Sequence, residues 1–212
     1  MKIKKQILAA VVFGLLASTA VLAAPAQIVL IRHGEKPPQG NELDAQGWQR
    51  ANALPGFFSS NPVVDAYGSP VAIYAMKPAH MNADGTNQES DANPEAGSLR
   101  PIETVTPLAQ GLGLTINESY SRKQIQSLVS DVMGNSSYEG RMVTICWEHS
   151  IIPQMAQAFG LTNGPTHWPD SVFDIAWVLH FNGDQVDGFQ LVPEALLPGD
   201  AMTAAQAAAE FR

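Results

Sequence analysis

The amino-acid sequence predicts an α/β fold, with a mostly parallel central sheet, helices on both faces and a C-terminal hairpin on edge strands. Short apolar runs alternate with longer segments of helical pattern, which is typical of parallel strands joined by helices. Two of these runs, 28–32 and 142–147, are almost continuously apolar, as in strands buried on both faces. Near the end of the chain, Asn182-Gly183-Asp184 separates two further apolar runs and indicates a tight turn between antiparallel strands.

Residue patterns in the first half of the chain support two strands and two helices. The strands are expected over 28–32 and 71–75, where β-branched and aromatic residues gather. Asp44 is placed to cap a helix over 44–59, because its side chain can accept a hydrogen bond from the first helical turn. A second helix is expected over 101–112, which opens with a proline, a residue that the first turn tolerates.

The second half continues the alternation and ends in the hairpin. In order, we expect a helix over 122–133, a strand over 142–147, a helix over 151–159, strands over 174–181 and 185–191, and an alanine-rich helix over 201–211. No repeat or long linker interrupts this series. We therefore expect a single α/β domain over 24–212.

Composition agrees with a folded domain and narrows its partners. The chain has 212 residues, of which 45% are hydrophobic and only 15% are charged, so it can bury a sizeable core. Its net charge of −8 makes it a poor partner for nucleic acid or for an anionic membrane surface. We expect positive potential only within a local binding pocket.

The first 23 residues are predicted to be a signal peptide. Three lysines precede an uncharged stretch from Ile7 to Ala24, and Val21 and Ala23 have the spacing of a signal-peptidase site. Loss of this segment changes the net charge from −8 to −11. The sequence thus predicts a periplasmic or secreted protein without stable membrane association after cleavage. An uncleaved anchor is the alternative, since 18 uncharged residues are at the short limit for a membrane span.

The stretch Ile28–Lys36, which reads Ile-Val-Leu-Ile-Arg-His-Gly-Glu-Lys, carries the clearest chemical signal. Its apolar strand stops at Arg32, His33 and Gly34, and ligands of open α/β sheets bind beyond the carboxyl ends of the strands. A guanidinium can fork onto phosphate oxygens, while an adjacent imidazole can act as base or nucleophile. The motif alone could equally be a solvated strand end.

Two later residues favour the chemical interpretation. Arg100 opens the helix after the second strand, and His149 follows the strand over 142–147. In this order, the motifs resemble those of the histidine phosphatase superfamily, in its phosphoglycerate-mutase-like branch. The resemblance extends from about residue 28 to the hairpin near residue 192.

The resemblance implies a role for each matched residue. His33 is the expected nucleophile, with its other ring nitrogen held by a backbone carbonyl. Arg32 and Arg100 are expected to bind the phosphate, and His149 to donate a further hydrogen bond as a cation beside the bound dianion. Cys146, the only cysteine, lies inside an apolar strand and is expected to be inert.

The proton donor is where the chain departs from the family. Mutase-like relatives carry a glutamate some way after the second arginine, and that position falls here near Arg122, Lys123 and Gln124. Relatives of the acid-phosphatase branch carry an aspartate directly after the second histidine, and here that residue is Ser150. Glu148 is our first candidate for the general acid and Glu118 the second.

Several residues keep two interpretations. Lys36 could extend the cationic rim toward a second substrate charge or could be an ordinary loop lysine. Trp168-Pro169-Asp170 could wall the pocket or could supply a packed aromatic. Residues 76–99 form a long polar insertion that we expect to be a lid or specificity loop. Its Asn, Asp and Glu residues miss the spacing of a calcium loop, so no metal site is predicted.

The sequence therefore predicts an exported phosphomonoesterase that acts on a small phosphorylated substrate without a cofactor. A phosphoglycerate mutase is one alternative, disfavoured by the export signal. A catalytically silent phospholigand-binding module is another, which the missing glutamate keeps open and the retained histidines and arginines disfavour. The physiological substrate and the oligomeric state do not follow from the sequence.

Overall fold

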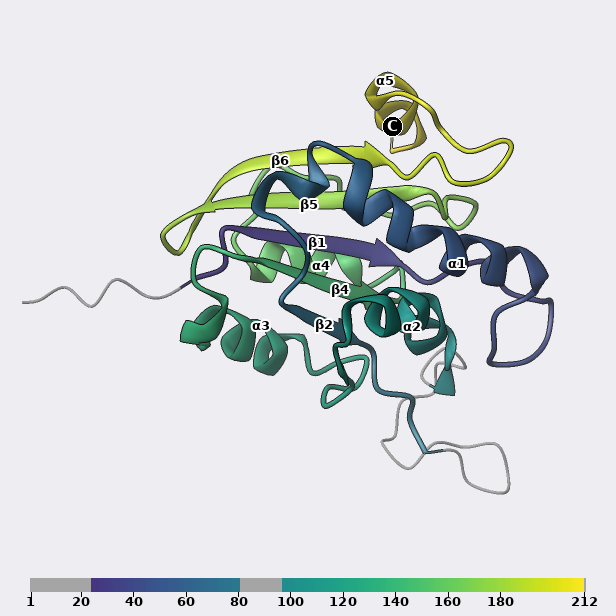
Figure 1. Ribbon diagram of the computed structural model, residues 1–212, viewed down its shortest axis with the longest axis horizontal. Helices are drawn as coiled ribbons and strands as arrows, with labels where there is room; N and C mark the ends of the chain where they lie inside the picture. The colour runs from purple at the N-terminus through teal and green to yellow at the C-terminus, as the bar shows by residue number, and fades with distance from the viewer. Residues whose placement is uncertain (1–23, 81–96, 212) are drawn as a thin grey trace, which may run out of the picture.

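A computed structural model of the chain describes residues 24–80 and 97–211 and shows a mixed α/β architecture (Figure 1). A six-stranded sheet has the strand order β3-β2-β4-β1-β5-β6. Its strands are β1 (Gln27–Arg32), β2 (Ala72–Ala75), β3 (Ile116–Asn117), β4 (Met142–Trp147), β5 (Ile175–Asn182) and β6 (Gln185–Pro193). The predicted fold class is confirmed.

The sheet has a parallel part and an antiparallel part. Strand β1 runs parallel to β4, which runs parallel to β2, and the short β3 continues this parallel part. On the other side of β1, strands β5 and β6 are antiparallel. Arg32 is in register with Trp147, so the residues that follow β1 and β4 emerge side by side. This is the edge where an open α/β sheet binds ligands.

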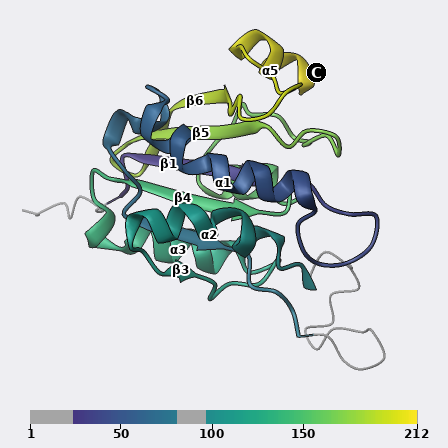
Figure 2. The ribbon, with the colours of Figure 1, turned by 45° about the vertical axis from the view of Figure 1, so that its right-hand side comes forward.

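Helices cover both faces of the sheet (Figure 2). On one face, α1 (Ala45–Ser60) and α2 (Arg100–Leu112) pack on Val29 and Ile31 of β1. On the other, α3 (Ile125–Gly134) and α4 (Ile152–Ala158) pack on Ile28 and Leu30. Alternate residues of β1 thus serve opposite cores, as strand geometry requires.

Some predicted boundaries were wrong for local reasons. The helix expected from residue 122 begins at Ile125, because the Ser121 N–H donates to the Gln124 side chain in a preceding turn. The last helix, α5, is shorter than expected and covers Ala204–Glu210, with Thr203 as its cap. Strand β3 and two short 3₁₀ helices, Val64–Tyr67 and Ser136–Tyr138, were not predicted.

The C-terminal hairpin was placed correctly but its strands are not equivalent. Strand β5 lies between β1 and β6, so only β6 is an edge strand. The burial of the two strands agrees with this strand order. All residues from Ile175 to Leu179 of β5 are buried, whereas β6 is largely accessible. Within residues 24–80 and 97–211, no helix has the length and hydropathy needed to cross a membrane.

Candidate active site

His33 directly follows β1 and is fully buried. Its backbone N–H donates to the Trp147 carbonyl at 3.2 Å, which extends the pairing of β1 with β4 by one residue. Its Nδ1 lies 2.7 Å from the Gly34 carbonyl oxygen. Because a carbonyl only accepts, Nδ1 carries the proton, and in the neutral ring Nε2 then presents its lone pair. The expected carbonyl partner of the histidine is thereby present.

Gly34 allows the first helix to approach the motif. A Cβ atom on Gly34 would lie 3.0 Å from both the Cα and the carbonyl oxygen of Gly47 in α1. A Cβ atom on Gly47 would lie only 2.4 Å from the Glu35 carbonyl oxygen. Asp44 caps the same helix by accepting from the Gly47 N–H at 2.8 Å, as predicted. The loop after His33 is therefore packed tightly against the beginning of α1.

Arg100 reaches the same loop from the first residue of α2, where it is buried. The Gly34 N–H donates to the Thr104 hydroxyl at 2.8 Å, and that hydroxyl donates to the Arg100 carbonyl at 2.7 Å. The Arg100 Nη1 donates to the Gly40 carbonyl at 3.1 Å. These bonds bring the N-terminus of α2 to the histidine motif and orient the guanidinium.

Arg32 is oriented by the loop that precedes β5. Its Nη1 donates to the carbonyl oxygens of Asp170, at 2.8 Å, and Val172, at 2.7 Å. Its guanidinium carbon lies 3.6 Å from the centre of the Phe173 ring. The same ring lies 6.2 Å from the His33 ring. A buried cation held by carbonyls and an aromatic face is rigid, which suits the recognition of a phosphate.

His149 lies at the end of β4 and contacts Asp170 from the same loop. Its Nε2 is 2.8 Å from the Asp170 carboxylate oxygen Oδ1. Burial and the nearby Arg32 cation lower the pKa of His149, although the hydrogen bond with Asp170 opposes them. The imidazole is therefore favoured as neutral, with its proton on Nε2. Its buried Nδ1 has no hydrogen-bond partner among the described residues. The expected cationic state would need a bound anion to raise this pKa.

Glu148, the first candidate for the general acid, directly precedes His149 and is buried. Its Oε2 accepts from Arg122 Nε, and its Oε1 accepts from Arg122 Nη2 at 3.5 Å and from the Ser150 hydroxyl. The Arg122 carbonyl in turn accepts from the Trp147 indole at 3.4 Å. Both carboxylate oxygens thus act as acceptors in a network that fixes the chain around His149. Its role as proton donor stays a prediction.

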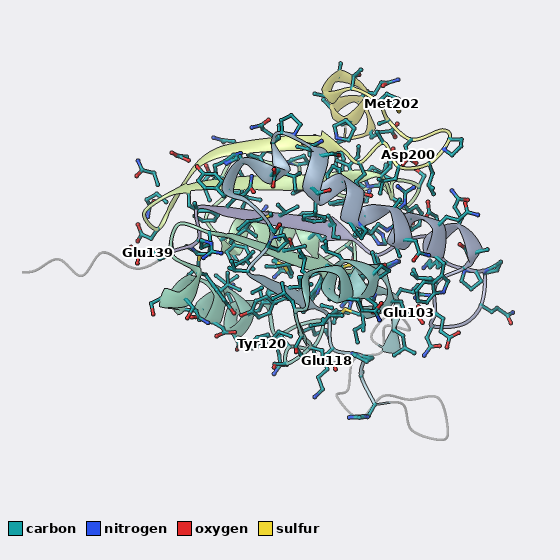
Figure 3. The ribbon with its side chains drawn as sticks, in the orientation of Figure 1. Glu103, Glu118, Tyr120, Glu139, Asp200 and Met202 are labelled. Atoms are coloured by element: carbon teal, nitrogen blue, oxygen red, sulfur yellow. The ribbon has the colours of Figure 1, made fainter. Side chains whose placement is uncertain are left out.

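The remaining predicted residues lie in different places. Glu118, labelled in Figure 3, is exposed and borders a surface hollow with Val71 and Ala72 at the amino end of β2. Lys36 is half-buried in the loop after the motif. Burial raises the pKa of the Cys146 thiol well above its usual range, consistent with an inert side chain. The insertion over 76–99 lies mostly outside the described residues, so its role as a lid stays a prediction.

A buried ion network also supports the site and was not predicted. Arg50 of α1 contacts Glu35 at 2.7 Å, Asp200 at 2.9 Å and Glu194 at 3.4 Å. Burial raises the pKa of Glu194 to about 8. A hollow of about 420 Å³ lies beside this network and is also lined by Phe173. Because Glu35 follows the histidine motif directly, the network ties the motif to the C-terminal segment.

Neither Phe173 nor the contact between Asp170 and His149 was predicted from the sequence. The tripeptide Trp168-Pro169-Asp170 did offer a signal: its interpretation as a packed aromatic is confirmed, and its interpretation as a wall of the pocket stays a prediction. Trp168 is a packed aromatic, with its ring centre 5.3 Å from that of Trp177 and an interplanar angle of 19°. Asp170, two residues later, lies at the site. The sequence did not indicate which residue of the tripeptide would pack in the core and which would lie at the site.

Comparisons with known proteins give structural matches only. No family model and no curated protein matches the chain. Phosphoglycerate mutase from Plasmodium falciparum is 14% identical, with a TM-score of 0.45 and coverage of 84% of this chain and 96% of that one. SixA from Agrobacterium tumefaciens is 15% identical, with a TM-score of 0.44 and coverage of 80% and 99%.

A mycobacterial glucosyl-3-phosphoglycerate phosphatase is also similar in structure. It is 13% identical, with a TM-score of 0.43 and coverage of 79% of this chain and 97% of that one. Each identity is low and each TM-score is below 0.5. The proposed function therefore rests on the chain's own residues and not on these matches.

Proposed function

We propose that this protein is an exported phosphomonoesterase of the histidine phosphatase type, which forms a phosphohistidine on His33. The observation that carries the proposal is the 2.7 Å contact of His33 Nδ1 with the Gly34 carbonyl oxygen. In the neutral ring this bond leaves Nε2 unprotonated at the end of β1, which is the state a nucleophilic imidazole requires.

The neighbouring cations supply the electrostatic part of the reaction. Phosphoryl transfer depends mainly on positioning and on donors aimed at the non-bridging oxygens. Arg32 and Arg100 are buried at the carboxyl edge of the sheet and are each oriented by backbone carbonyls. In the proposed reaction both bind the phosphate, and the Nε2–H of His149 donates a further hydrogen bond. Lys36 is proposed to bind a more distal part of the substrate.

The first test is a screen of the purified mature chain against a panel of phosphate esters. We expect phosphate release, and we expect His33→Ala to lower kcat by at least about 10⁴-fold because the nucleophile is lost. His180→Ala is the matched control, since His180 pairs with Gln27 at the opposite end of β1. Hydrolysis that survives His33→Ala would overturn the mechanism.

The second test separates the phosphatase from its alternatives. Rapid quenching without acid during turnover should trap a phosphoryl group on His33 that is labile in acid and stable in base. A mutase would return this group to a second hydroxyl of the substrate, whereas a phosphatase transfers it to water. A silent binding module would bind phosphate esters with no phosphohistidine. Phosphate on a serine or cysteine would exclude His33 as the nucleophile.

Export is a separate part of the proposal. It is supported by the lysine-rich start and uncharged stretch of residues 1–23, which lie outside the described residues. N-terminal sequencing of the protein from its native host should find a chain that begins at or near Ala24, as a single α/β domain in the soluble periplasmic or secreted fraction. An intact Met1 in the membrane fraction would favour the anchor.

A further inference from the structure

Resting on the proposed function, we propose that Asp170 is the general acid of the first chemical step and the general base of the second. The geometry points to Asp170 because its carboxylate contacts His149 from the loop that also orients Arg32. This assigns the proton-transfer role to a residue far along the chain from Glu148 and Glu118.

The backbone of Asp170 is fixed next to the site. Its carbonyl accepts from Arg32 Nη1 at 2.8 Å. On either side the loop is anchored, because the indole of the buried Trp168 donates to the Val172 carbonyl at 2.9 Å. The side chain behaves differently, since it is 90% exposed and, among the described residues, its one hydrogen bond is to His149 Nε2. A carboxylate on a fixed backbone can therefore rotate without disturbing the loop.

Within the described residues, the other carboxylates near the motif are committed to structural contacts. Glu148 is 3% exposed and accepts from Arg122 and Ser150. Glu35 forms an ion pair with Arg50 at 2.7 Å, and Glu103 accepts from the Leu43 N–H at 2.7 Å. Within residues 24–80 and 97–211, only Asp170 combines an exposed carboxylate with a hydrogen bond to His33 or His149.

The proposed reaction has two steps. In the first, His33 Nε2 forms a bond to phosphorus while the bond from phosphorus to the ester oxygen breaks, and protonated Asp170 gives its proton to that oxygen. The alcohol leaves. In the second, ionised Asp170 takes a proton from water, the water oxygen bonds to phosphorus and the bond from phosphorus to nitrogen breaks. Inorganic phosphate leaves, and His33 and protonated Asp170 are restored.

The surrounding charges give the first step an acidic pH dependence. His149 of β4 and Arg32 of β1 face Asp170, with His167 on the same loop, and Glu148 lies beyond His149. In the free protein the hydrogen bond with His149 lowers the pKa of Asp170. A bound phosphate dianion opposes this effect, because it disfavours a second negative charge beside it. Protonated Asp170 is therefore most populated in the substrate complex at low pH.

The experiment compares Asp170→Asn with wild type in rapid-quench kinetics, using glycerol phosphate and p-nitrophenyl phosphate. We expect phosphorylation of His33 by glycerol phosphate to slow by about 10²–10³-fold, because an alkoxide needs a proton to leave. Phosphorylation by p-nitrophenyl phosphate should slow by less than about tenfold, because nitrophenolate leaves without one. The phosphohistidine should then accumulate, since the base for the second step is missing.

Three further measurements decide the result. Glu148→Gln, the carboxylate variant on the other side of His149, should show no dependence on the leaving group. Asp170→Glu should recover part of the rate with glycerol phosphate, because it restores a carboxylic acid. The pH profile of wild-type phosphorylation by glycerol phosphate should fall toward high pH, and this fall should be absent in Asp170→Asn.

Equal slowing with both substrates, or no slowing with either, would overturn the assignment to Asp170. A leaving-group-dependent loss in Glu148→Gln alone would move the role to Glu148. These outcomes are distinct from failure of the proposed function, in which the wild-type protein would form no phosphohistidine on His33. Because the Asp170 side chain is 90% exposed, we expect Asp170→Asn to fold as wild type does.

Discussion

Two carboxylates flank His149, and their surroundings are opposite. Glu148 precedes the histidine in sequence and is buried, with a side chain 3% exposed. Asp170 comes from the loop before β5 and is 90% exposed. Glu148 accepts hydrogen bonds from Arg122 and Ser150 through both oxygens, whereas Asp170 has one bond, to His149 itself.

This difference separates a structural carboxylate from one that can exchange protons. A buried carboxylate held by a guanidinium resists movement, since breaking the pair would leave charge in a poorly solvated place. An exposed carboxylate with one partner can turn toward substrate or water at little cost. We therefore expect the accessibility of a carboxylate, and not its position next to His149 in the sequence, to indicate which of the two exchanges protons.

The largest expected effect is on folding stability. Glu148→Ala should lower the free energy of unfolding by about 3–5 kcal/mol, because it removes a buried charged partner from Arg122. Asp170→Ala should lower it by less than about 1 kcal/mol, as expected for an exposed pair. Urea denaturation followed by tryptophan fluorescence measures both, and comparable losses in the two variants would remove the distinction between the carboxylates.

Much of the fold could be predicted because its signals are local. The apolar run of β4 was predicted with its bounds, 142–147. Asp44 was predicted as the cap of α1 because capping depends on residues within one turn. The two-residue β3 was missed, since Ile116 and Asn117 carry too short a pattern and are strand only through pairing with β2.

The candidate site also has a part that the sequence predicted and a part that it did not. Arg32, His33 and His149 stand at strand ends, and the sequence shows strand ends directly. The contacts of Asp170 and Phe173 with Arg32 cross more than 100 positions, because Arg32 meets Asp170 at a separation of 138, and Asp170 reaches His149 across 21 positions. Nothing local in the sequence indicates such a contact. The Arg50 network was missed for the same reason, since Arg50 and Asp200 are 150 positions apart.

A third carboxylate, that of Glu194, is buried and differs from both Glu148 and Asp170. Glu194 shares the Arg50 guanidinium with Glu35 and Asp200, so that one buried cation faces three acids. Burial raises the pKa of Glu194 to about 8. Burial also opposes ionisation of Asp200, but the hydrogen bonds and charge of Arg50 and the backbone N–H groups of Leu196 and Leu197 together outweigh it and lower the pKa of Asp200. There is thus a pH range in which Glu194 keeps its carboxyl proton in the folded state but has lost it in the unfolded chain.

This raised pKa predicts a specific pH dependence. Stability associated with Glu194 is fully present below the unfolded pKa near 4.3 and is lost as pH rises toward 8. Glu194→Gln has no such proton to lose. Between pH 5 and pH 8, the wild-type free energy of unfolding should fall relative to Glu194→Gln by about 2 kcal/mol or more. The lowered pKa of Asp200 acts below this window. A difference that stays constant with pH in denaturation experiments would contradict the shift.

The loop that bears Asp170 can be tested through its aromatic residue. The Phe173 ring lies 3.6 Å from the Arg32 guanidinium carbon, and a cation–π contact of this kind contributes about 1–2 kcal/mol when shielded from water. Phe173→Leu keeps an apolar side chain but removes the ring. Inorganic phosphate should then bind about 5–30-fold more weakly by isothermal titration calorimetry. Phe189→Leu in β6 is the control, because its ring contacts Trp177 and not Arg32.

The smallest expected effect lies on the Glu148 side. The Ser150 hydroxyl donates to Glu148 Oε1, and Ser150 is exposed, so Ser150→Ala should lower the free energy of unfolding by about 1 kcal/mol or less. The Arg122 contacts remain in this variant and should keep Glu148 in place. Phosphorylation rates with alkyl and aryl phosphates should therefore change by the same small factor. If Ser150→Ala instead slowed only the alkyl substrate, the hydroxyl would be part of a proton path through Glu148, and Glu148 would have to be treated as mobile despite its burial.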